Sequence, residues 1–201
     1  MENTRKVKPW DEMSDKEKAS TRKSWRRKLP EKFDVFCLGD LETPAVNDYQ
    51  VPGDLYVRGN LRSADVIVGE NLFVEGDVNA FAVKVKKDFY VGGRIDSFGI
   101  NVGDDFILAN RAQFWNEDVV VGGDFICGST LRCGDLSTGG DIRIDGEAKA
   151  ITIQTCGDLE IHGDLSCGTL NVQGSFIVDG FIKTYAQYSS YSIGRPFLCE
   201  S

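Results

Sequence analysis

The stretch Gly53–Leu61, GDLYVRGNL, returns in altered form at residues 157–165 as GDLEIHGDL. Versions of it recur every 17 residues from about residue 52 onward, and only the fourth turn is longer, by two residues. Self-similarity at a short fixed period indicates a stack of repeated structural units. The eight turns begin at Pro52, Gly69, Lys86, Gly103, Gly122, Gly139, Cys156 and Gln173.

The pattern inside one turn, numbered as positions 1 to 17, predicts the fold. Apolar residues concentrate at positions 4 and 6, 10 and 12, and 15 and 17, and a spacing of two is that of a strand with one face buried. Position 11 lies between two inward positions and holds no apolar residue in any turn. We therefore expect an all-β protein, a single parallel β-helix with three short strands per 17-residue coil. Parallel crossovers are generally right-handed, so right-handed winding is expected.

The corners of the coil carry two further regularities. Position 8 is glycine in six of the eight turns, which predicts a backbone conformation with positive φ. Position 3 is aspartate in six turns, and such a side chain accepts hydrogen bonds from the backbone of its own corner. A ladder of divalent-cation sites is the alternative use of this column, and we favour the hydrogen bonds. The aspartates are Asp54, Asp88, Asp105, Asp124, Asp141 and Asp158.

The chain divides into three segments. Residues 1–34 hold 11 Lys or Arg against 7 Asp or Glu in a protein whose net charge is −8. Ser14 and Glu17 fit a capping box, and Pro30 ends a helix, so we expect an α-helix near residues 15–28. We expect residues 35–184 to form the β-helix, with 35–51 as an irregular first coil, and residues 185–201 to form a C-terminal cap.

Composition excludes several classes of function. A net charge of −8 argues against nucleic-acid binding by the β-helix body. The only histidine, His162, has Glu160 and Asp164 nearby in sequence, and an exposed corner residue is expected there rather than a catalytic pair. The six cysteines form no C-x-x-C pair, so we expect no zinc site and small apolar thiols in a cytoplasmic protein. No catalytic residue, cofactor or metal is predicted, and membrane contact through residues 1–34 is a minor alternative.

One column does not fit a plain solvent-exposed strand. Position 5 lies between two inward positions and should point outward, yet it holds a large apolar residue in five consecutive coils. A continuous apolar stripe is normally covered or used for binding. Three readings stay open: cover by residues 1–34, contact with a partner or sister chain, and a merely β-favouring surface. The candidate interface residues are Tyr56, Phe73, Tyr90, Ile107 and Ile126, with Trp115 in the enlarged corner of the fourth turn.

The repeats at 53–61 and 157–165 resemble the bactofilins, bacterial polymer-forming cytoskeletal proteins with a short-coil right-handed parallel β-helix. The resemblance covers roughly residues 52–182. It implies a non-enzymatic structural or self-assembling protein whose partner is another copy of itself. The alternative is an adaptor that binds one protein partner through the apolar ladder, and a small β-helix enzyme is the least favoured.

Overall fold

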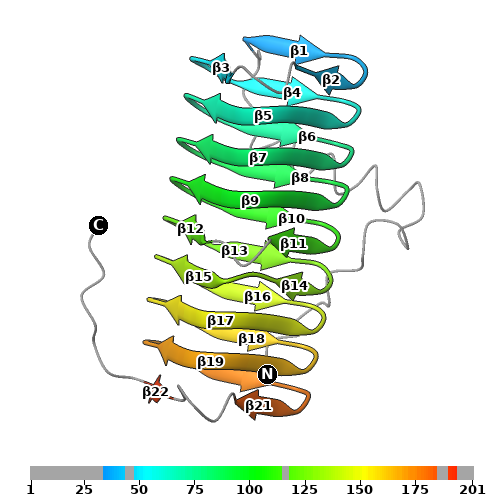
Figure 1. Cartoon of the computed structure of the whole chain (residues 1–201). Helices are drawn as coiled ribbons and strands as arrows, with labels where there is room; N and C mark the ends of the chain where they lie inside the picture. The colour runs from blue at the N-terminus through cyan, green and yellow to red at the C-terminus, as the bar shows by residue number, and fades with distance from the viewer. Residues whose placement is uncertain (1–33, 44–47, 115–117, 185–189, 194–201) are drawn as a thin grey trace, which may run out of the picture.

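The computed structural model describes residues 34–43, 48–114, 118–184 and 190–193 of the chain. They form a β-solenoid in which the coils stack into a rod and every strand pairing is parallel (Figure 1). Leu55 pairs with Leu72, and Leu72 pairs with Phe89, so each coil repeats the register of the one before. The predicted all-β parallel solenoid is therefore confirmed. The expected helix near 15–28 lies outside the described residues, and the hand of winding stays a prediction.

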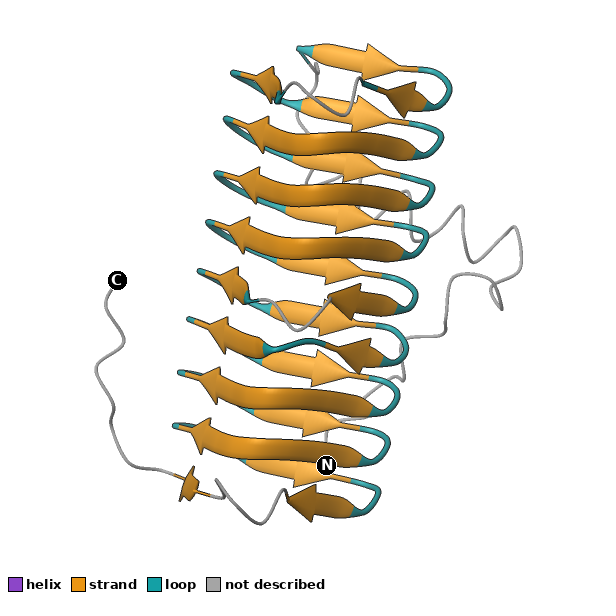
Figure 2. Ribbon diagram, viewed as in Figure 1, coloured by secondary structure: helices purple, strands orange, loops and turns teal. Residues whose placement is uncertain are grey.

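The strands collect into two sheets that face each other across the core (Figure 2). One sheet has nine strands, built from positions 4 to 6 of each coil. Its strands are β1 (Val35–Cys37), β4 (Leu55–Val57), β6 (Leu72–Val74), β8 (Phe89–Val91), β10 (Phe106–Leu108), β13 (Phe125–Cys127), β16 (Ile142–Ile144), β18 (Leu159–Ile161) and β20 (Phe176–Val178).

The second sheet has thirteen strands and contains positions 10 to 17. In five coils these positions form one eight-residue strand: β5 (Leu61–Val68), β7 (Val78–Val85), β9 (Ile95–Val102), β17 (Ala148–Thr155) and β19 (Leu165–Val172). Elsewhere they form shorter strands: β2 (Leu41–Glu42), β3 (Tyr49–Val51), β11 (Ala112–Phe114), β12 (Val119–Val121), β14 (Leu131–Arg132), β15 (Asp135–Thr138), β21 (Ile182–Thr184) and β22 (Ser190–Ile193).

The prediction of three separate strands is therefore wrong for those five coils. The bend between positions 12 and 15 contains only two residues, and in these five coils the strand continues through it, whereas in the fifth coil β14 and β15 are separate. In β5 and β7, Ser63 pairs with Ala80 and Asp65 with Ala82, and only Phe81 and the residue opposite it are skipped. Side chains along a strand alternate between inward and outward. Because position 13 is left out of the ladder, this alternation shifts by one residue at the bend, and positions 12 and 15 both point inward. In the fourth coil the longer corner does separate β11 from β12.

The core confirms the six predicted inward columns. Every member of the large buried cluster lies at position 4, 6, 10, 12, 15 or 17, including Phe89, Phe106 and Phe125 at 0% exposure. Phe89 and Phe106 stack with ring centroids 4.9 Å apart, so the core itself contains an aromatic ladder. Burial of each inward methylene contributes about 0.8 kcal/mol, and this repeated burial is the main source of stability.

The corner glycines are explained by close packing and not by positive φ. None of the glycines at position 8 has a φ between +20° and +160°. A Cβ on Gly76 would lie 2.6 Å from the carbonyl oxygen of Gly59 in the preceding coil, and one on Gly163 would lie 2.6 Å from that of Gly146. These distances are below van der Waals contact, so the predicted cause was wrong. In the six glycine corners adjacent coils approach each other too closely for a side chain, whereas the fourth and fifth coils hold Asn110 and Ser129 at this position.

The solenoid extends further than the repeat pattern at both ends. Within residues 35–51, the strands β1, β2 and β3 pair with β4 and β5 as a leading coil. Val35 pairs with Leu55, so this coil is longer than the 17-residue repeat. At the other end β22 pairs with β19, which places Tyr191 and Ile193 beside Leu170 and Val172. Extra residues in each terminal coil concealed this register in the sequence.

Candidate functional site

The column at position 5 lies on the outer face of the nine-stranded sheet, as predicted, but its aromatic residues are not exposed. Tyr56, Phe73 and Tyr90 are 8%, 3% and 2% exposed, and they form a small cluster separate from the core. Ala109, at position 7, joins this cluster and Ile107 packs against it. Of the three readings left open by the sequence, a bare β-favouring surface does not fit the low exposure of these three residues. Ile107 and Ile126 are half-buried, and Trp115 lies outside the described residues.

The aromatic stripe, defined here as Phe36, Tyr56, Phe73 and Tyr90, is a continuous stack in which Phe36 is exposed and the other three rings are buried. Ring centroids are 4.6 Å apart for Phe36 and Tyr56, 5.9 Å for Tyr56 and Phe73, and 4.7 Å for Phe73 and Tyr90. Offset or tilted contacts of this kind contribute about 0.5–1.5 kcal/mol each beyond their area. Phe36 extends the stripe into the leading coil, which the 17-residue period could not reveal.

Each tyrosine of the stripe has an acidic partner at its edge. The Tyr56 hydroxyl donates to the carboxylate of Glu75, and the Tyr90 hydroxyl donates to Asp88 Oδ2 at 3.3 Å. Burial raises the pKa of Tyr90 above its ordinary value, and the neighbouring charges of Asp88 and Asp105 raise it further. Both hydroxyls therefore act as hydrogen-bond donors, and the stripe is bordered by negative charge.

The column at position 3 forms a hydrogen-bonded ladder along the rod. The carboxylate of Asp124 accepts from the backbone N–H of Asp141 at 2.8 Å, and Asp141 accepts from Asp158 at 2.8 Å. The same bond joins Asp34 to Asp54, Asp54 to Asn71, Asn71 to Asp88, Asp88 to Asp105, Asp105 to Asp124 and Asp158 to Ser175. The sequence predicted backbone donors correctly but assigned them to the wrong coil: each side chain binds the next corner, not its own. Within the described ranges no group of three metal-ligating side chains is present.

This ladder leads to a prediction about Asp141. Asp141→Ala removes the acceptor for the Asp158 N–H, and we expect a loss of about 1–3 kcal/mol in the free energy of unfolding. Asp141→Asn keeps an acceptor oxygen, as Asn71 does naturally, and should change stability much less. Thermal melts of both variants, with and without a chelator, measure this. A cation ladder would instead make the two variants equally harmful and make the wild-type protein sensitive to the chelator.

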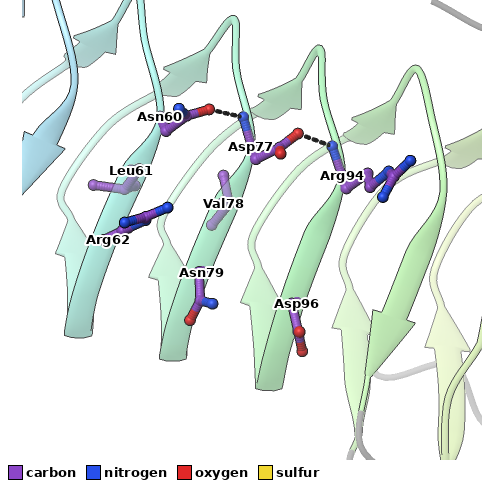
Figure 3. A pocket seen from close by; sticks show the side chains of 8 residues that line it. All are labelled: Asn60, Leu61, Arg62, Asp77, Val78, Asn79, Arg94 and Asp96. Carbon is purple, nitrogen blue, oxygen red and sulfur yellow. Dashed lines mark hydrogen bonds between the residues drawn. The ribbon is translucent and has the colours of Figure 1, made fainter. Parts of the chain in front are cut away.

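A second ladder, at position 9, escaped the sequence analysis. Asn60 Oδ1 accepts from the Asp77 N–H and Asp77 Oδ1 from the Arg94 N–H, both at 2.8 Å (Figure 3). Arg62, Asn79 and Asp96 lie beside these residues on the adjoining strands, around a shallow depression of about 210 Å³. Small-molecule sites are commonly about 300–1,000 Å³ and largely apolar. The column was missed because its residue types vary, from Asn60 to Phe181.

His162 belongs to a charged cluster at position 7 of the later coils. Its Nδ1 lies 2.8 Å from Asp179 Oδ2 and its Nε2 lies 3.0 Å from Glu160 Oε1. Only 7% of its side chain is exposed, so the expected exposed histidine is wrong. Asp164, expected nearby, instead accepts from the Phe181 N–H. The imidazole of His162 is thus nearly enclosed, while the side chain of its partner Asp179 is 51% exposed.

Asp145 completes this cluster from the preceding coil. Its Oδ1 accepts from Arg143 Nε at 3.1 Å, and its side chain is 6% exposed. Burial raises the pKa of Asp145 above its ordinary value, and the Arg143 guanidinium offsets part of that effect. The exposure within this cluster is uneven: Asp145 and His162 are nearly enclosed, Arg143 and Glu160 are 18% and 21% exposed, and Asp179 is 51% exposed.

Among the described cysteines, Cys37, Cys127, Cys133 and Cys167 are free thiols and Cys156 is disulfide-bonded. Burial raises the pKa of Cys127 and Cys133 to about 12 and that of Cys167 to about 11, so these thiols are unreactive at neutral pH. Cys156 is disulfide-bonded, and the expectation that all six cysteines are free thiols is wrong for that residue. Structural disulfides persist mainly in oxidising compartments, which is one observation against the expected cytoplasmic location.

The apolar residues that are exposed lie elsewhere than predicted. At position 13, Phe81 and Phe98 are 62% and 44% exposed, and their rings stack with centroids 5.0 Å apart. Position 13 lies at the bend of the long strands, where no inward or outward column was assigned. The two terminal coils hold most of the remaining exposed apolar side chains: Phe36, Leu38, Ile177, Phe181 and Ile182.

Comparison of the chain with family models, curated proteins and solved structures found no match in any of the three. In the part of the chain that the structure describes, no helix has the length and apolarity needed to cross a membrane.

Proposed function

We propose that this protein is a non-enzymatic structural rod that self-assembles end to end. The observation that supports this is the chemistry of its two terminal coils. In the last coil Ile177, Phe181 and Ile182 are 52%, 76% and 47% exposed, and in the leading coil Phe36 and Leu38 are 55% and 71% exposed. Large apolar side chains that remain exposed at both ends of a rod favour contact between the ends.

The backbone at the ends supports the same contact. Among the described strands, β20 pairs only with β18, and β1 pairs only with β4. Each end therefore presents a strand edge, which is a template for pairing with another chain. Ile177 and Phe36 both occupy position 5, so stacking one rod on another in register would place them side by side. Contact between two different ends does not close on itself, and it generates an open filament.

The resemblance to bactofilins agrees with this proposal, and the partner is then a second copy of the chain. A cytoplasmic location is part of the same proposal. The Cys156 disulfide argues against this location but not against self-assembly. The second candidate function is an adaptor for one protein partner, favoured by the exposed Phe81–Phe98 stack on the side of the rod.

Sizing of the purified full-length protein tests the proposal. We expect large, concentration-dependent species by light scattering and filaments by electron microscopy. Phe181→Asp should reduce the mass to a small discrete species, because a charge at the end opposes apolar stacking. Phe98→Asp is the matched control, since it places the same change on the side of the rod. A monomeric wild-type protein at high concentration, or a polymer unaffected by Phe181→Asp, would contradict end-to-end assembly and favour the adaptor.

A further inference from the structure

The outer face of the nine-stranded sheet is buried over three consecutive coils and half-buried over the next four. Its aromatic half contains Tyr56, Phe73 and Tyr90 at 8% exposure or less, and Ala109 at 4% follows in the fourth coil. Its polar half contains Asp145 and His162, whose side chains are 6% and 7% exposed. All of these side chains stand at positions 5 and 7, outside the core cluster. Low exposure on an outer face requires a layer of atoms above it.

No described strand supplies that layer. The strands of this sheet pair with one another edge to edge, and the members of the small aromatic cluster all come from β4, β6, β8 and the corner after β10. Stacking at 4.6–5.9 Å covers the flat faces of the rings but leaves their outer edges to be covered by something else. For the aromatic half, the cover must therefore come from chain outside the described residues. The polar half is enclosed in part by contacts among its own side chains, Arg143 with Asp145 and His162 with Glu160 and Asp179.

Among the undescribed segments, residues 1–33 are the best placed to cover this face. They lead directly into Asp34 and β1, the first strand of this sheet. The undescribed stretches 44–47 and 115–117 are short and connect strands of the other sheet, and residues 185–189 and 194–201 flank β22, which also belongs to the other sheet. A helix rises 1.5 Å per residue, so even a fully helical segment of 33 residues reaches about 50 Å. The seven coil steps from β1 to His162 need only about 34 Å at 4.8 Å each.

The chemistry of residues 1–33 matches the face. They contain Trp10, Trp25 and Phe33 among 11 Lys or Arg and 6 Asp or Glu. The face offers the aromatic stripe, with Glu75 beside Tyr56 and Asp88 beside Tyr90, and farther along Glu160 and Asp179. Arg58 and Arg143 are its basic residues at positions 5 and 7. Aromatic side chains on a basic segment suit an aromatic stripe bordered by acids.

We propose that residues 1–33 dock in cis along the outer face of the nine-stranded sheet, as a strap that covers the stripe from Tyr56 to Tyr90 and continues toward His162. The strap keeps this face from contacting other molecules, so lateral association of rods requires its release. The proposal is independent of end-to-end assembly, because the strap lies on the side of the rod.

Limited proteolysis of the full-length protein tests the strap. Its many Lys and Arg residues are trypsin sites, and docking should slow their cleavage at least about ten-fold relative to the same protein in denaturant. Phe73→Glu places a charge in the middle of the stripe, and we expect it to restore fast cleavage of residues 1–33 while the rod stays resistant. Phe98→Glu is the matched control on another face and should leave protection unchanged. Tyr90→Arg provides a second variant, with circular dichroism reporting whether each rod remains folded.

Several results would overturn the strap. Cleavage of wild-type residues 1–33 at the rate of an unfolded peptide would show that the segment is not docked. Protection that survives both Phe73→Glu and Tyr90→Arg in folded rods would place it on a different face. Protection that disappears on dilution would show that the cover comes from a sister chain. Sedimentation of the same samples reports assembly separately, so a failure of either proposal can be recognised.

Discussion

Val91→Asp should abolish the folded state. Val91 is at position 6 and 0% exposed, and its strand neighbours in register are Val74 and Leu108. A carboxylate there would be buried among apolar side chains without a partner. Such a change costs more than about 4 kcal/mol, a large part of the roughly 5–15 kcal/mol that stabilises a typical domain. Far-UV circular dichroism and a thermal melt should show an unfolded or aggregated protein.

Val120→Asp is the control for this experiment. Val120 occupies position 16, points outward and is 43% exposed, so the same change of side chain should alter stability by less than about 1 kcal/mol. If Val91→Asp melted cooperatively within a few degrees of the wild-type protein, the inward assignment of position 6 would be wrong.

Gly76→Ala should destabilise the rod by roughly 2–4 kcal/mol, since it forces adjacent corners apart. The new Cβ would lie 2.6 Å from both the Gly59 carbonyl oxygen and Asn60 Oδ1. The Gly76 N–H also donates to the Gly59 carbonyl at 3.1 Å, and Asn60 Oδ1 accepts from the Asp77 N–H at 2.8 Å. Moving the corner to relieve the overlap therefore weakens two bonds between coils. For a chain of this size we expect the melting temperature to fall by about 5–15 °C.

Gly99→Ala provides the matched comparison. No atom lies within 4 Å of a Cβ built on Gly99, and its φ is not positive. Alanine there should be neutral or stabilise by up to about 1 kcal/mol, because it restricts the unfolded chain. Equal melting temperatures for the two variants would show that close approach of the corners is not the reason for glycine at position 8.

The columns of the solenoid could be predicted from sequence because every coil must bury side chains at the same positions. Each of the six inward positions must be apolar in coil after coil, so a single misplaced residue does not obscure the pattern. The terminal coils could not be predicted as well, since the extra residues in the leading coil and before β22 shift the register. Residues such as Val35 and Ile193 therefore fall outside the 17-residue frame although they pair in the same columns.

The candidate site was predicted less completely, for a different reason. Alternation along a strand gives the direction of a side chain but not what lies above it. Tyr56, Phe73 and Tyr90 were therefore assigned correctly to the outer face, but whether they are covered could not be decided from the sequence. His162 was misjudged for the same reason, because its Asp179 partner is 17 residues away and becomes adjacent only through the stacking of coils. The exposed Phe81 and Phe98 were missed because position 13 lies in the bend between the inward pairs at 10 and 12 and at 15 and 17, where no direction was assigned.

The ladder at position 3 has a mechanical consequence. Each side chain of the ladder accepts a hydrogen bond from the next coil. The backbone hydrogen bonds between coils likewise lie parallel to the long axis of the rod. A tensile load applied to the two ends would therefore act on successive coil interfaces in series. In a solenoid each coil contacts only its neighbours, so the weakest interface sets the tensile strength of the whole rod, whatever its length.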